Sequence, residues 1–197
     1  MRRKEGERAA LDNEVEAIGA RGWVEVIVKD KDGNIKQRFP PQESDEEDED
    51  DPPFVATFPA KMAEYYWRRN IVVNTGLAAI IRLIFSGLTE EKFGYLAIGT
   101  GTTPESPSDT ALGNEIARKL ASITQITSAV EGDTAKLEAE FSSSDGISGT
   151  HSVSESGIFN SSSGGILLAR KVFPALTLDF TGGDSILIRY YVQILRA

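Results

Sequence analysis

Short runs of strand-forming residues, separated by turn residues, follow one another along the second half of the chain. Three of the intervening turns read "EGD", "SSSGG" and "TGGD", and glycine beside Asp or Ser is typical of tight turns. Strand-length runs joined by such turns predict about six strands that pair antiparallel. The runs span residues 95–99, 120–130, 134–144, 151–160, 166–173 and 185–195. We therefore expect a mainly β protein with an antiparallel β-sandwich or jelly-roll-like domain.

A further pair of strands is predicted near the N-terminus, over residues 23–39. The run that starts at Trp23 is rich in valine and isoleucine, Asp32-Gly33 supplies a hairpin turn, and the residues up to Phe39 alternate on the way back. An isolated hairpin is marginal in water. We therefore expect this hairpin to join a sheet of the same chain or of a neighbouring subunit.

The segment 70–92 changes from the period of a strand to the period of a helix. Its apolar residues recur at positions i, i+3, i+4, i+7 and i+8, which places them on one face of an amphipathic helix. These residues are Leu77, Ile80, Ile81, Ile84 and Phe85. Asn74 or Thr75 can cap the start of this helix, and Gly87 can end it.

The net charge of −9 comes almost entirely from one segment. Residues 40–54, "PPQESDEEDEDDPPF", hold eight carboxylates and no basic residue, so the rest of the chain carries a net charge of about −1. Like charges repel and the flanking prolines prevent regular pairing, which predicts an exposed loop at 43–51. This loop is either a solvated connection or a contact for cations or a basic partner.

The predicted elements divide the chain into two regions. Residues 1–69 hold an arm, the hairpin and the acidic loop, and they are interpreted as an assembly or interaction region. Residues 70–197 are interpreted as the sandwich domain. The first residues, 1–19, are mostly charged and predict either a short helix or an arm that becomes ordered on a partner.

Composition excludes several classes of function. The chain has no cysteine, so it has no disulfide, thiolate metal site or cysteine nucleophile. It shows no clustered basic face, so we expect no nucleic-acid partner. No apolar run is long enough to span a bilayer, and the charged start "MRRKEGER" is not followed by an apolar stretch. We therefore expect neither a membrane partner nor a signal peptide.

A glycine-rich turn follows the strand at 95–99 and invites comparison with a nucleotide-binding loop. A dinucleotide fingerprint needs a third glycine where this chain has Pro104, and it must open a helix inside a βαβ unit. The Gly-Lys-Ser or Gly-Lys-Thr of a P-loop does not occur in the sequence. We expect Gly99 and Gly101 to serve a tight bend at the end of the strand instead.

Few residues offer catalytic chemistry. His151 is the only histidine, and no nucleophile elbow accompanies it, so we expect a loop or strand-edge residue. Glu138 and Glu140 alternate along one strand, which places both on the same, solvent-facing side. Glu155 is expected to form a structural ion pair with Arg118 or Arg170. We expect no enzyme, no cofactor and no metal site.

Five short motifs occur in an order that resembles structural proteins of tailed-phage virions, the group often labelled tail-fibre or minor tail proteins. A helix start "VVNTGL" is followed by the strand end "AIGTG", a Pro/Asp/Thr loop with "TALGNE", the strand "ESGIF" and then "LLAR". The resemblance covers residues 70–195. The acidic segment 43–51 is not part of it.

This resemblance implies a structural component of a tailed-virus particle, assembled in the host cytoplasm and located in the tail, baseplate or fibre. Alternative roles are a capsid-vertex, decoration or neck protein, or a receptor- or glycan-binding module at a fibre tip. The partners implied are copies of the chain itself in a trimer or ring, other virion proteins and the host cell surface. The residues expected at contacts between subunits are Trp23, Tyr65, Tyr66 and Trp67.

Overall fold

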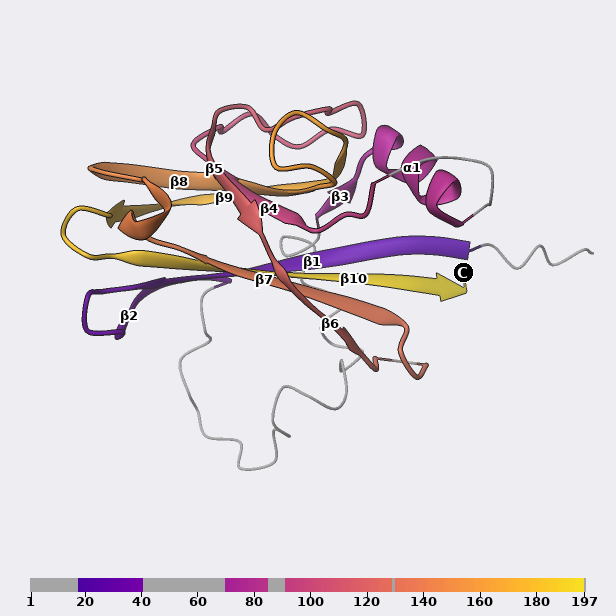
Figure 1. The fold of residues 1–197 in the computed structure, drawn as a ribbon, viewed down its shortest axis with the longest axis horizontal. Helices are drawn as coiled ribbons and strands as arrows, with labels where there is room; N and C mark the ends of the chain where they lie inside the picture. Colours follow the sequence, from indigo (N-terminus) through magenta and orange to yellow (C-terminus); the bar gives the residue numbers. More distant parts are fainter. Residues whose placement is uncertain (1–17, 41–69, 85–90, 129, 197) are drawn as a thin grey trace, which may run out of the picture.

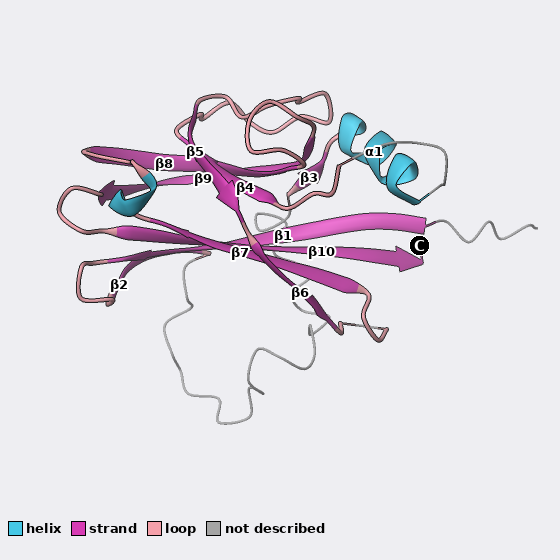
Figure 2. Cartoon of the chain, in the orientation of Figure 1, coloured by secondary structure: helices cyan, strands magenta, loops and turns pink. Residues whose placement is uncertain are grey.

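The computed structural model describes residues 18–40, 70–84, 91–128 and 130–196. Within these residues two antiparallel sheets face each other, and one α-helix lies against the second sheet (Figures 1 and 2). This architecture confirms the predicted mainly β fold, a β-sandwich with a single helix. None of the described helical segments has the length and apolar character that crossing a membrane would need.

The first sheet, sheet A, contains both ends of the described chain. Its central strand β10 pairs with β1 along twelve residues and with β7 on its other side. The order across the sheet is β2 (Ile35–Phe39), β1 (Ile18–Lys29), β10 (Ser185–Arg196), β7 (Thr134–Phe141) and β6 (Ser122–Ile126).

The second sheet, sheet B, is built around the hairpin of β8 and β9. This hairpin is flanked by the two-residue strand β3 on one side and by β4 and β5 on the other. The order is β3 (Ile71–Val72), β9 (Leu167–Asp179), β8 (Thr150–Phe159), β4 (Tyr95–Gly99) and β5 (Glu115–Leu120). A short 3-10 turn at Ser143–Asp145 connects β7 to β8.

The main core lies between the two sheets, where alternate residues of the central strands meet. These include Val24, Val26, Val28, Ile186 and Ile188 from sheet A and Leu96, Ile98, Val153 and Ile158 from sheet B. Polar contacts between Tyr190 and Ser156 also cross this core. The hydroxyl of Tyr190 in β10 donates to the backbone carbonyl of Ser156 in β8 at 2.8 Å, which satisfies two buried polar groups at once.

The predicted N-terminal hairpin is present as β1 and β2, joined by the turn at residues 30–34. The side chain of Asp30 shapes this turn, because it accepts backbone hydrogen bonds from Asp32 and Asn34, each at 2.9 Å. The hairpin was expected to join a sheet either of the same chain or of a neighbouring subunit. It joins sheet A of the same chain. The boundary expected after residue 69 therefore separates strands that pair with one another, because β1 is a neighbour of β10.

The helix α1 (Asn74–Ile84) forms where predicted, but only Ile80 of its apolar stripe packs against the main core, and the other described members of the stripe are exposed. Amphipathic helices usually bury that stripe, whereas Leu77, Ile81 and Ile84 are 46%, 52% and 65% exposed. The buried side holds the two small residues Gly76 and Ala79. A Cβ at Gly76 would lie 2.6 Å from the carbonyl oxygen of Leu168, so the helix approaches β9 too closely for larger side chains on that side. Phe85 and Gly87 lie outside the described residues.

The structure contains a strand that was not expected from the sequence, β5, between the predicted strands at 95–99 and 120–130. β5 pairs with β4 in sheet B, and after Ala121 the chain continues as β6 in sheet A. One bent stretch of chain thus joins the two sheets along this side, as strands at the corners of sandwiches do.

Candidate functional site

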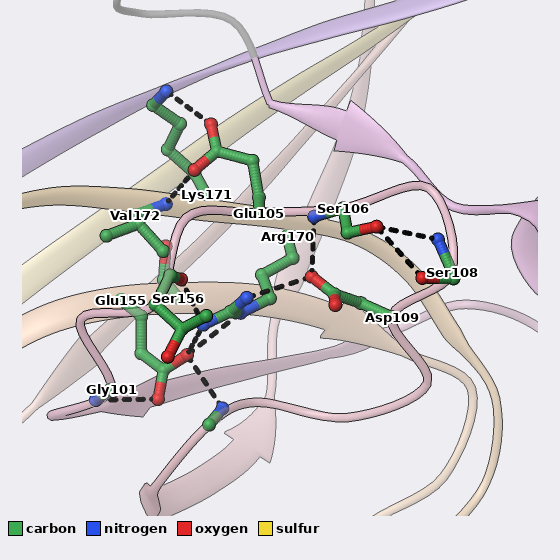
Figure 3. A network of polar contacts seen from close by, with 12 residues as sticks. Gly101, Glu105, Ser106, Ser108, Asp109, Glu155, Ser156, Arg170, Lys171 and Val172 are labelled. Atoms are coloured by element: carbon green, nitrogen blue, oxygen red, sulfur yellow. Dashed lines mark hydrogen bonds and ion pairs between the residues drawn. The ribbon is translucent and has the colours of Figure 1, made fainter.

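The five motifs singled out in the sequence meet at one place on the outer face of sheet B. Figure 3 shows the polar part of this place, where Gly101, Asp109, Glu155 and Arg170 come together. The loop between β4 and β5, residues 100–114, lies over this face and is held by side chains from β8 and β9. We call this arrangement the clamp. It consists of the side chains of Glu155, Arg170 and Asp109 and the backbone N–H groups of Gly101, Gly113 and Asn114.

The carboxylate of Glu155 is the centre of the clamp and is fully buried. Its Oε1 accepts hydrogen bonds from the backbone N–H groups of Gly101 at 2.8 Å and Asn114 at 2.7 Å. Its Oε2 accepts one from the N–H of Gly113 at 2.9 Å. Three N–H groups from the two ends of the loop therefore converge on one side chain of β8. The loop ends lie together because this carboxylate binds both.

Arg170 neutralises the buried carboxylate and reaches into the middle of the loop. Its Nε and Nη2 donate to Oε2 of Glu155 at 2.9 Å and 2.8 Å. Its Nη1 donates to Oδ2 of Asp109 at 2.8 Å, and Nη2 also donates to the carbonyl of Thr103 at 3.1 Å. The planar guanidinium suits such a fork of acceptors. The side chain of Arg170 thus binds the loop at Thr103 and at Asp109, and it also binds Glu155, which holds the two ends of the loop.

Two further contacts tie the same loop to its surroundings. The carboxylate of Glu105 accepts hydrogen bonds from Lys171 Nζ at 2.7 Å and from the backbone N–H of Val172 at 3.2 Å. The carbonyl of Pro107 accepts one from the backbone N–H of Asn74, the first residue of α1, at 2.9 Å. Loop, helix and β9 are therefore connected by polar contacts as well as by packing.

Gly99 and Gly101 are required by close approach to Glu155, not by an unusual backbone angle. A Cβ at Gly99 would lie 2.6 Å from Oε1 of Glu155, and a Cβ at Gly101 would collide with the same atom. A Cβ at Gly113 would lie 3.3 Å from the Cα of Gly101. The sequence analysis assigned Gly99 and Gly101 to a tight bend. The structure adds that their missing side chains make room for the buried carboxylate.

A small apolar cluster lies beside the clamp, under the loop and the start of α1. Leu112 from the loop is buried here among residues of β4, β8 and β9. Gly157 leaves the space that Leu112 enters, since a Cβ there would lie 3.0 Å from the Cδ2 of Leu112. The cluster contains Val73, Ala97, Leu112, Phe159 and Leu167. Each motif therefore contributes either a polar group of the clamp or an apolar side chain of this cluster.

The electrostatics of the clamp keep both of its central groups charged. Burial alone would raise the pKa of Glu155, but the backbone N–H groups of Asn114 and Gly113 and the guanidinium of Arg170 outweigh it and lower that pKa. Burial would likewise lower the pKa of Arg170, but Asp109 and Glu155 raise it. A general acid at neutral pH needs a raised carboxyl pKa. The environment of Glu155 acts in the opposite direction.

The structure decides between the two expected partners of Glu155. Arg170 is the partner, whereas Arg118 binds the carboxylate of Glu115 and the carbonyls of Ser161 and Gly164. The guanidinium of Arg118 also lies over the ring of Phe159, with 3.4 Å between its central carbon and the ring centroid. Arg118 thus covers the outer edge of the apolar cluster.

The other carboxylates considered for chemistry are also paired with cations. Glu138 binds Arg189 and Lys136, and hydrogen bonding by Arg189 lowers its pKa. For Glu140, burial favours a higher pKa, but hydrogen bonds from Ser185 and Lys29 outweigh it and lower the pKa. His151 lies near the start of β8, where its Nε2 is 3.0 Å from the carbonyl of Ser148.

The residues expected at contacts between subunits are only partly described. Trp23 lies in β1, half-buried, with the guanidinium carbon of Arg21 5.4 Å from its ring centroid. Tyr65, Tyr66, Trp67 and the acidic loop 43–51 lie outside the described residues. Among the residues that the structure describes, no group of three or more His, Asp or Glu side chains is placed to hold a metal ion.

Asp109 and Glu105 are the residues of this site to which the sequence analysis gave no role. Both lie in a loop of turn-forming residues, where a carboxylate carries no pattern that distinguishes a buried contact from a solvated one. The signal that could have found them is the pair Arg170-Lys171. Two adjacent cations inside an otherwise apolar strand need acidic partners from another segment.

Comparisons with protein-family models, with curated proteins and with solved structures find no match to this chain. The geometry of the clamp and the resemblance of the motifs are therefore the observations on which a function can be argued.

Proposed function

We propose that this protein is a structural component of a tailed-virus particle, located in its tail, baseplate or fibre apparatus. In this role copies of the chain assemble with each other and with other virion proteins, and the chain catalyses no reaction. The proposal takes its location from the resemblance of the five motifs to virion proteins.

The observation that carries the proposal is the convergence of those motifs on the clamp. Their polar residues bind one another: Glu155 of "ESGIF" accepts hydrogen bonds from "AIGTG" and "TALGNE" and pairs with Arg170 of "LLAR". Because the polar groups of these motifs are hydrogen-bonded to one another, the motifs stabilise the fold of the domain. This supports a resemblance in architecture, which is what a role as a building block requires.

The surface of the described domain also favours assembly. Large apolar side chains are exposed on α1 and around β5 and β6, among them Ile84, Leu120 and Val130. Contiguous exposed apolar patches commonly mark sites of protein contact. By contrast, the carboxylates considered for catalysis are paired with cations and have lowered pKa values.

Immunogold electron microscopy of intact particles tests the location. Antibody raised against the purified chain is applied to virions from the source, and antibody pre-absorbed with the same chain serves as the control. Gold on the tail, baseplate or fibres is the expected result. Gold on the head or its vertices would replace this location with the capsid-vertex role, and particles without gold would contradict a virion role altogether.

A further inference from the structure

The edge strand β6 differs from the other sheet edges in carrying no protection against pairing. The edges of the two sheets are β2, β6, β3 and β5 among the described strands. β2 carries Lys36 and Arg38, β5 carries Glu115, Arg118 and Lys119, and β3 is two residues long. Charges, shortness and bulges are the usual means by which proteins block edge-to-edge pairing. β6 reads "SITQI" and has no charge, proline or glycine.

The free edge of β6 is open to solvent and is flanked by apolar side chains. Its first four residues, 122–125, are all exposed, and among the described strands it pairs with β7 alone. Ile123 is 50% exposed within the strand, and Leu120 and Val130 are 66% and 68% exposed near its two ends. An unpaired backbone edge beside exposed apolar side chains is the kind of surface that accepts an additional strand.

We propose that β6 pairs antiparallel with β6 of a second copy of this chain, around a two-fold axis at Thr124. In a five-residue strand, the self-pairing that matches every residue places the middle one on the axis. Thr124 then faces the partner's Thr124, Ile123 faces the partner's Gln125, and Ser122 faces the partner's Ile126. The two copies of sheet A become one continuous sheet.

The uncharged edge of β6 suits a second copy of itself as the occupant, because the self-pairing places no charged residue of β6 against another. The nearest charges on the β7 side are Lys136 and Glu138, which pair with Thr124 and Ser122. In the paired sheet, Lys136 of each copy is separated from its equivalent by two uncharged strands, which is about 14 Å at normal strand spacing. That distance exceeds the screening length of physiological salt, about 8 Å. Self-pairing thus brings no like charges of β6 or β7 together.

The β6 contact rests on the proposed function, in which copies of the chain assemble with each other. The contact can nevertheless be wrong while the virion role is right. A two-fold contact closes a pair of chains, so a trimer or ring would need a different interface as well. A chain that labels virus particles but remains monomeric in solution would reject the β6 contact alone.

The molar mass of the full chain in solution tests whether two copies associate. Light scattering coupled to size-exclusion chromatography should show a dimer that dissociates on dilution. Thr124→Glu places two carboxylates opposite each other on the axis, while Lys136 beside it favours the change within each copy. We expect the dissociation constant to rise about fivefold or more. Ile35→Glu, on the exposed edge strand β2, is the matched control and should leave it unchanged. A monomeric wild-type chain, or a dimer that Thr124→Glu does not weaken, would overturn the proposal.

Single cysteines test the register, because the chain contains none of its own. Thr124→Cys should form a cross-linked dimer on mild oxidation with diamide, since residues facing each other in a sheet have Cβ atoms about 5 Å apart. Ser122→Cys alone should not, because its own equivalent would lie four residues away, about 14 Å. A mixture of Ser122→Cys and Ile126→Cys chains should cross-link to each other. Cross-linking of Thr124→Cys no faster than that of Ile35→Cys would contradict the contact.

Discussion

Glu155 and Arg170 form a fully buried ion pair across two neighbouring strands, and they are diagonal to each other, not directly opposite. In the register of β8 and β9, Glu155 lies opposite Val172, and Arg170 lies opposite Gly157. The diagonal lets Arg170 Nε and Nη2 reach Oε2 of Glu155 at 2.9 Å and 2.8 Å, while Gly157 admits Leu112 from the loop. The strand pairing thus creates both the polar and the apolar half of the site that holds residues 100–114.

Removing either member of this pair should destabilise the protein strongly. Arg170→Met leaves the buried carboxylate of Glu155 without its cation, for which we expect a loss of about 3–5 kcal/mol in the free energy of unfolding. Glu155→Gln leaves Arg170 with Asp109 as its remaining carboxylate, so we expect a smaller loss for this variant. The double variant should lose less than the sum of the two single losses, because the interaction between Glu155 and Arg170 is lost only once. Urea unfolding of the four proteins measures this cycle.

An exposed ion pair supplies the control for that cycle. Lys31→Met breaks the pair of Lys31 with Asp32, whose side chains are 69% and 63% exposed. We expect a change within about 0.5 kcal/mol. Strict additivity of the Glu155 and Arg170 variants would show that the two groups do not act as a pair.

Glycine substitutions should distinguish close approach to the carboxylate from ordinary packing. In Gly101→Ala the new methyl group would collide with Oε1 of Glu155, so we expect a loss of about 1–3 kcal/mol. Gly94→Ala is the matched change, since its Cβ would lie at normal contact distances of 3.6 Å and 3.7 Å from Leu120 and Ile123. Thermal unfolding should show a lower Tm only for Gly101→Ala. Equal effects of the two substitutions would count against the close approach.

The stability of the fold should fall in acid, and Glu155 should be one cause. The folded state lowers the pKa of Glu155, so as pH falls the unfolded chain takes up this proton first, near its usual value of about 4.3. The contribution of Glu155 is complete above that value and is lost progressively below it. Urea midpoints measured from pH 7 to pH 3 should therefore fall less steeply below pH 5 in Glu155→Gln than in the wild type. Parallel curves would argue against a lowered pKa.

The orientation of α1 gives a test on the helix surface. Ile81→Lys replaces a half-exposed side chain and should change the free energy of unfolding by no more than about 0.5 kcal/mol. Ala79→Leu enlarges a fully buried residue and should cost about 1–3 kcal/mol. Chemical denaturation of both variants compares them. A larger loss for Ile81→Lys would place the apolar stripe against the core after all.

The strands were predictable because their signal is local. The expected strand at 95–99 coincides with β4, and the hairpin at 23–39 forms with its turn at Asp32-Gly33. The orientation of α1 was not predictable from the sequence. The periodicity identifies the apolar stripe, but it does not show which face of the helix the sheet can approach. Here close contact between Gly76 and Leu168 selected the side with small residues.

The clamp was predictable only in part. Glu155 was expected in a strand, in an ion pair, and Arg170 was one of its two expected partners. The contacts of Glu155 with Gly101, Gly113 and Asn114 span 54, 42 and 41 residues along the chain, and no local pattern encodes them. β5 was missed for a related reason. Its sequence "EIARKL" is charged and partly exposed, and pairing with β4 makes it a strand.

The central claim is that Glu155 is a buried, charged acceptor that binds the two ends of the loop. The most direct test is an NMR titration that follows the side-chain carboxyl carbon of Glu155 together with the amide protons of Gly101, Gly113 and Asn114. We predict a carboxyl midpoint below the usual value of about 4.3 for glutamate, with the three amide shifts changing along the same curve. A midpoint at or above that value, with amide shifts that do not follow it, would contradict the clamp and reopen a catalytic role for this carboxyl group.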